Sequence, residues 1–104
     1  TPSFFTVEAM HYLVSLQLRH LLVDMPSVDR LFDEGKLSVH HIFFLFSAGA
    51  HSAGNQPQQD RTITEMIYVP AQIADGKYLL NLQIAPFMAD AAPSRPVLYA
   101  LNPA

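Results

Sequence analysis

Two adjacent histidines, His40 and His41, fall in a segment with the apolar spacing of a helix. Neutral imidazole is the commonest protein ligand for a metal ion. Successive residues of a helix point about 100° apart, so we expect at most one of the two side chains to bind a given ion. On spacing alone, two core or interface histidines without a metal are favoured, because the strong helical metal signature places its histidines three or four residues apart.

A carboxylate, Glu65, lies within a run whose residues alternate between two faces of an expected strand, residues 62–69. One face carries this carboxylate among apolar side chains: Ile63, Glu65, Ile67 and Val69. If that face is buried, Glu65 needs a partner, a proton or a metal ion to offset its desolvation. In the alternative, Thr64, Met66 and Tyr68 point inward, and the period alone favours this second arrangement.

A third group of polar side chains, Asp24, Ser27 and Asp29, lies in a proline-containing loop after an expected buried strand. Loops that leave strand ends are where α/β folds place much of their chemistry, so these residues could bind a substrate or orient a ligand. Aspartate and serine in such a loop also cap turns and helices, and their residue types favour this second role.

Composition excludes several classes of function. The sequence has no cysteine, which rules out thiolate metal sites and cysteine nucleophiles. The four glycines are scattered, so neither a phosphate-binding glycine loop nor a serine nucleophile elbow is present. The net charge of -3 gives no electrostatic support for nucleic-acid binding. No signal peptide and no apolar run near the length of a membrane span is visible, so we expect a cytoplasmic protein without membrane contact.

The apolar periodicity predicts two helices, residues 7–17 and 36–47, and four strands, residues 20–24, 62–69, 78–84 and 96–101. Residues 52–60 are polar and predict an exposed loop. Asp75-Gly76 marks a turn, so we expect residues 62–69 to pair antiparallel with residues 78–84. The expected fold class is α/β, a single domain over residues 1–104 with a small mixed sheet and two helices.

In this order, the segments resemble the C-terminal half of the cyclase family, which includes bacterial kynurenine formamidases. The matching text covers most of the chain: residues 19–29 (RHLLVDMPSVD), 36–41 (KLSVHH), 62–65 (TITE), 75–82 (DGKYLLNL) and 90–98 (DAAPSRPVL). The resemblance implies half of that family's swivelling β/β/α fold.

In that family, a helix histidine and a glutamate on the following strand help to hold one or two divalent ions, usually zinc or manganese. By position, His40 resembles that histidine, with His41 the less favoured choice, and Glu65 resembles the glutamate. The family's His-x-Gly-Thr-His-x-Asp segment does not occur in these 104 residues. The remaining ligands and the acid–base histidine belong to that segment, so no catalytic residue is assignable here.

The resemblance implies a truncated or stand-alone piece of a metal-dependent amide or lactone hydrolase, acting on a C–N bond if it is active. We expect weak or no activity without the missing N-terminal half, which is a possible partner. The alternative is a non-catalytic, self-associating protein on the same half-fold. Apolar residues make up 50% of the chain and charged residues only 14%, which favours a homodimer or another homo-oligomer in either case.

Overall fold

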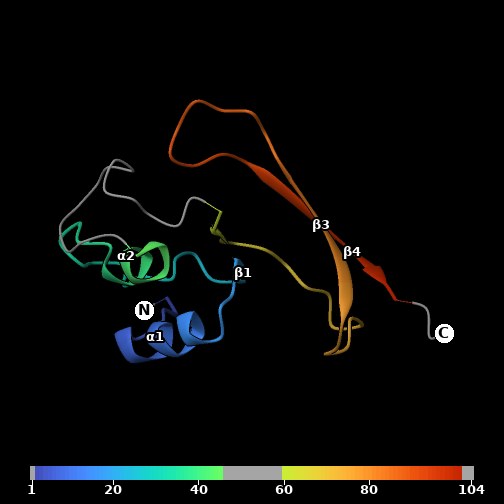
Figure 1. Ribbon diagram of the computed structural model, residues 1–104, viewed down its shortest axis with the longest axis horizontal. Coiled ribbons are helices and arrows are strands. Elements are labelled where there is room, and N and C mark those ends of the chain that lie inside the picture. Colours follow the sequence, from blue (N-terminus) through green and yellow to red (C-terminus); the bar gives the residue numbers. More distant parts are fainter. Residues whose placement is uncertain (1, 46–59, 102–104) are drawn as a thin grey trace. The chain divides into compact units, whose positions relative to one another are not determined.

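The computed structural model describes residues 2–45 and 60–101, and its elements there are two helices and four strands (Figure 1). In chain order these are α1 (Val7–Ser15), β1 (His20–Leu22), α2 (Ser38–Phe44), β2 (Thr62–Thr64), β3 (Tyr78–Ile84) and β4 (Ser94–Ala100). The chain divides into two compact units, residues 1–68 and residues 69–104. The prediction of a single domain over residues 1–104 stays a prediction.

Helix α1 begins where the sequence predicts. Thr6 is extended and its side-chain oxygen accepts the backbone N–H of Ala9, which satisfies one of the free donors of the first turn. Glu8 adds a negative charge near the positive end of the helix dipole. The helix is two residues shorter than predicted, because the chain turns at Gln17, whose φ is 60°.

Strands β1 and β2 form a parallel pair in which Leu21 is opposite Ile63. The predicted antiparallel pairing of residues 62–69 with residues 78–84 is therefore wrong. Strand β2 ends at Thr64, and Met66 adopts a left-handed conformation with a φ of 61°, which breaks the extended alternation expected to continue to residue 69.

Helix α2 is shorter than the predicted residues 36–47, of which residues 46 and 47 lie outside the described part of the chain. Leu37 and Leu45 flank it, with φ angles of 49° and 60°. A left-handed conformation is unfavourable for a residue with a bulky side chain, so both ends are held by their surroundings. Leu37 makes no side-chain capping bond, and the first N–H groups of α2 find an acceptor elsewhere.

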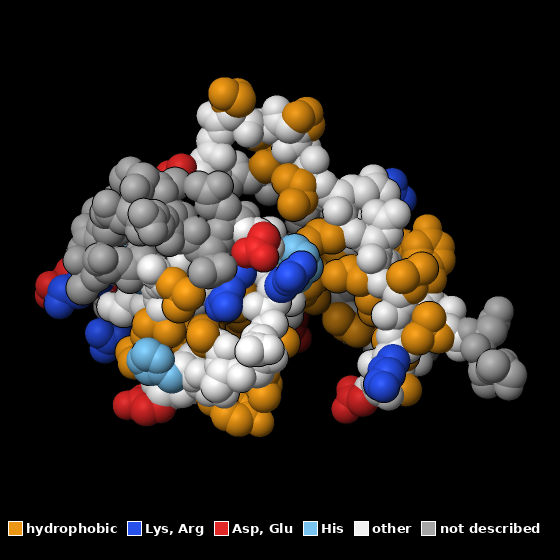
Figure 2. Space-filling model, in the orientation of Figure 1, with side chains coloured by type: hydrophobic (Ala, Val, Ile, Leu, Met, Phe, Trp, Pro, Cys, Tyr) orange, Lys and Arg blue, Asp and Glu red, His pale blue; other side chains and the backbone are white. Residues whose placement is uncertain are grey.

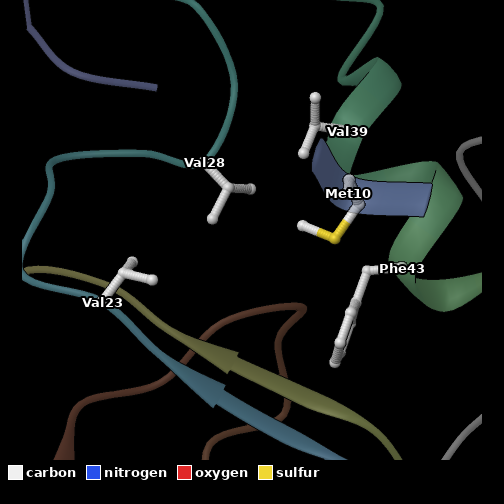
Figure 3. Close-up of a cluster of buried hydrophobic side chains, with 5 residues drawn as sticks. All are labelled: Met10, Val23, Val28, Val39 and Phe43. Atoms are coloured by element: carbon white, nitrogen blue, oxygen red, sulfur yellow. The ribbon is translucent and has the colours of Figure 1, made fainter. Parts of the chain in front are cut away.

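The core of the first unit is a cluster of five buried side chains that point toward one another (Figure 3): Met10, Val23, Val28, Val39 and Phe43. They come from α1, from the residue directly after β1, from the loop that follows and from α2. Burial of each such side chain contributes about 1.5–3 kcal/mol relative to exposure. The cluster therefore fixes the loop after β1 against the start of α2.

In the second unit, β3 and β4 form an antiparallel pair whose register runs from Tyr78 opposite Ala100 to Ile84 opposite Ser94. The bounds predicted for β3 are confirmed, and β4 begins two residues earlier than predicted. Figure 2 shows apolar side chains gathered over this hairpin, at the right of the view.

The α/β class is confirmed, but the expected single mixed sheet is wrong. The described residues form two two-stranded sheets, one parallel and one antiparallel. Except for Asp60, the polar segment of residues 52–60 lies outside the described residues. No helix within the described ranges is both long and apolar enough to cross a membrane.

Candidate functional site

The candidate site lies where the parallel strands β1 and β2 end. The loop of residues 24–29 leaves β1, and Glu65 directly follows β2. His40 is in the first turn of α2. Carboxyl ends of parallel strands meet at one sheet edge, and this brings the loop and Glu65 together.

Core residues precede two of the site residues in the sequence and position them. Val28, which is fully buried, comes directly before Asp29, and Val39, also buried, comes directly before His40. Both valines belong to the cluster of Figure 3. Packing of the core therefore sets the backbone from which Asp29 and His40 reach each other.

The imidazole of His40 lies between two carboxylates. Its Nδ1 is 2.7 Å from Oδ2 of Asp29, and its Nε2 is 3.2 Å from Oε2 of Glu65. The exposed fractions of the side chains are 5% for Asp29, 21% for His40 and 25% for Glu65. One edge of the imidazole is thus shielded, while the side toward Glu65 is reached by solvent.

Glu65 is turned toward His40 by a second contact. The backbone N–H of Val28 donates to the same Oε2 atom at 2.8 Å. Met66 and Tyr68 are each 75% exposed, so the arrangement that would place the opposite face of the strand inward is not observed. The left-handed φ of Met66 ends the two-residue alternation directly after Glu65, so the pattern does not apply to residues 66–69.

Asp29 holds the start of α2. Its Oδ1 accepts the backbone N–H of Val39 at 2.8 Å, and its Oδ2 accepts that of His40 at 3.0 Å. Burial raises the pKa of the Asp29 carboxyl. The two N–H groups and the His40 side chain lower this pKa by more than burial raises it, so the net pKa lies below the usual range. The carboxyl is therefore an anion at neutral pH.

The three residues expected in the substrate-binding loop have different environments. Asp29 makes the capping contacts that the sequence offered as its other role, and Ser27 Oγ accepts the backbone N–H of Asp29 at 3.1 Å. Asp24 is exposed. Substrate binding by Asp24, Ser27 and Asp29 stays a prediction.

The two histidines on α2 have different surroundings, as the helix geometry predicts. His41 is only 8% exposed, whereas His40 faces both carboxylates. His40 Nε2 therefore approaches Glu65, the second ligand expected from the sequence.

Within the described ranges, no group of three or more His, Asp or Glu side chains is placed to hold a metal ion. Asp29 lies on the Nδ1 side of the imidazole, so it does not join His40 Nε2 and Glu65 in one ligand set. The described part of the site offers an ion two donor atoms, His40 Nε2 and Glu65 Oε2.

Sequence reasoning missed two contacts. The bond between Asp29 and His40 joins residues in a loop and a helix, and no periodic pattern relates them. Arg61 donates from its guanidinium to the carbonyl of Phe43 at 3.1 Å and lies over the Phe43 ring, so it caps the end of α2 from the residue before β2. An isolated arginine after a polar segment gives no signal for this role.

Comparisons with protein-family models, with curated proteins and with solved structures gave no significant match to this chain.

Proposed function

We propose that this chain is a truncated or stand-alone piece of a metal-dependent amide or lactone hydrolase of the cyclase and kynurenine formamidase type. In this proposal, His40 and Glu65 supply two ligands to one divalent ion, zinc or manganese. The chain would correspond to half of that family's swivelling β/β/α fold. The observation that carries the proposal is the 3.2 Å separation of His40 Nε2 and Glu65 Oε2.

This separation fits two ligands of one ion. Zinc binds histidine nitrogen and carboxylate oxygen at about 2.0–2.2 Å in a tetrahedral arrangement, which sets two such ligands about 3.4 Å apart. The observed 3.2 Å between Nε2 and Oε2 needs only a small adjustment. The partial exposure of both side chains leaves a side from which an ion can enter.

The chain's own residues prepare this pair for a cation. The N–H of Val28 fixes one oxygen of Glu65, so the carboxylate does not have to be ordered when the ion arrives. When bound, a divalent ion in such a hydrolase supplies Lewis acidity and an activated water. Catalytic zinc sites usually have three protein ligands, so two ligands support weak or no activity unless another segment completes the site.

The test is metal uptake by the full 104-residue chain, measured by isothermal titration calorimetry with zinc chloride and with manganese chloride. We expect binding at micromolar concentrations, and at least tenfold weaker binding in His40→Ala and in Glu65→Ala. His20→Ala and Glu34→Ala are matched controls, because these exposed side chains lie outside the pair, and they should bind as the unchanged chain does. Absence of metal uptake by the unchanged chain would overturn the proposal. So would a metal affinity in His40→Ala and Glu65→Ala equal to that of the unchanged chain.

The second candidate, a non-catalytic self-associating protein, is favoured by one face of the β3–β4 hairpin. In the observed register this face is apolar at nearly every position: Tyr78, Leu80, Leu82, Ile84, Pro96, Leu98 and Ala100. A two-stranded hairpin is at best marginally stable alone, so a face of this kind needs a covering surface. A homodimer by analytical ultracentrifugation that takes up no zinc or manganese and cleaves no formyl-amide would support this candidate over the hydrolase.

A further inference from the structure

The shorter of the two contacts of His40 is not with the proposed co-ligand Glu65. It is the 2.7 Å contact between Nδ1 and Oδ2 of Asp29, against 3.2 Å on the Nε2 side. The Asp29 side chain is 5% exposed, so little water competes for this oxygen. Its carboxylate accepts, and a neutral imidazole can donate from only one of its nitrogens.

Asp29 is itself immobilised by its other partners. Its two oxygens accept the backbone N–H groups of Val39 and His40, and its own N–H donates to Ser27 Oγ. The neighbouring side chains of Val28 and Val39 lie in the core. The carboxylate is therefore fixed before any ligand reaches the site, and the orientation of the ring follows from it.

We propose that Asp29 is a positioning residue, which accepts the Nδ1–H of His40 and thereby leaves Nε2 as the nitrogen that faces Glu65 and would bind an ion. The assignment of the proton to Nδ1 depends only on the contact with Asp29. The role of Nε2 as a ligand of an ion rests on the proposed function. Histidine ligands of metals commonly donate their other N–H to a carboxylate, which fixes the ring and raises its basicity. Loss of such a partner typically weakens metal binding about 10–100-fold.

A purely structural role for Asp29, as a cap of α2, gives different results. A cap stabilises the helix but does not decide which ring nitrogen carries the proton. Asp33 is a matched control, because it accepts the backbone N–H groups of Gly35 and Leu37 just before α2 and makes no contact with His40 among the described interactions. Asp33→Asn and Asp29→Asn change charge and volume equally.

The first experiment locates the imidazole protons of His40 in the ¹⁵N-labelled full chain by long-range ¹H–¹⁵N correlation NMR. We expect a proton on Nδ1 both with a chelator present and with zinc added, because the Asp29 contact does not depend on the ion. An Nδ1 without a proton in the unchanged chain would overturn the inference, whether or not zinc binds. This measurement needs no variant and therefore holds even if Asp29→Asn does not fold.

The second experiment compares zinc affinities by calorimetry. Asp29→Asn should bind zinc about 10–100-fold more weakly, whereas Asp33→Asn should match the unchanged chain. Equal zinc affinity in Asp29→Asn and the unchanged chain would refute the positioning role. If the unchanged chain shows the Nδ1–H signature but binds no zinc, the proposed function fails while the assignment of the tautomer stands.

Discussion

The convergence of His40 and Glu65 can be tested without any metal, through the free energy of unfolding. In a double-mutant cycle, His40→Ala, Glu65→Ala and the double variant are compared with the unchanged chain, all with a chelator present and at about pH 5, where a histidine ordinarily carries protons on both ring nitrogens. The coupling between the two substitutions isolates the His40–Glu65 contact from the other bonds of each side chain.

The expected magnitudes follow from the partners of each group. Glu65→Ala removes the acceptor of the Val28 N–H, and Val28 is fully buried, which costs about 1–3 kcal/mol. The contact with His40 is longer, at 3.2 Å, and both side chains are partly exposed. When the imidazole carries protons on both nitrogens, Nδ1–H donates to Asp29 and Nε2–H donates to Glu65, and we assign this second bond about 1 kcal/mol. Glu65→Ala should then cost about 2–4 kcal/mol in total, of which about 1 kcal/mol disappears when His40 is already alanine.

Urea unfolding followed by far-UV circular dichroism measures these differences, because both helices of the described chain lie in the first unit. For a urea slope of about 1 kcal/mol per M, a coupling of about 1 kcal/mol corresponds to about 1 M in the midpoint. A cycle between His20 and Glu65 is the control and should be additive within about 0.5 kcal/mol, since His20 contacts Thr62 instead. A His40–Glu65 coupling below about 0.3 kcal/mol would refute the convergence, and with it the shared ligand pair.

Two further substitutions test the framework that positions the site. Phe43→Ala removes a fully buried ring and should lower the free energy of unfolding by about 3–5 kcal/mol, whereas Phe32→Ala, at a ring that is 86% exposed, should change it by less than about 0.5 kcal/mol. Equal effects would contradict the core of Figure 3. Thr6→Ala removes the side-chain acceptor for the Ala9 N–H and should cost about 1 kcal/mol in the same urea experiment, and an unchanged midpoint would contradict this cap.

Local residue patterns were sufficient for the elements with strong periodicity or a clear boundary signal. The start of α1 follows from Thr6 and Glu8, and the bounds of β3 follow from the apolar residues at every second position, Tyr78, Leu80, Leu82 and Ile84. The end of β2 could not be predicted, because the left-handed turn at Met66 involves a residue type that rarely adopts it. Strand pairing was also missed, since an Asp-Gly turn indicates where a chain reverses but not which strands lie beside each other.

By itself, the sequence determined the α/β class, the absence of thiolate chemistry and the residue types that could hold a cation, since these depend on composition and local spacing. Only the tertiary structure decided that Glu65 faces His40 and that Asp29 holds the other side of the imidazole. The physical reason is distance along the chain. The three residues lie in a loop, a helix and a strand end, and only the packing of Val28 and Val39 into one core brings those segments together.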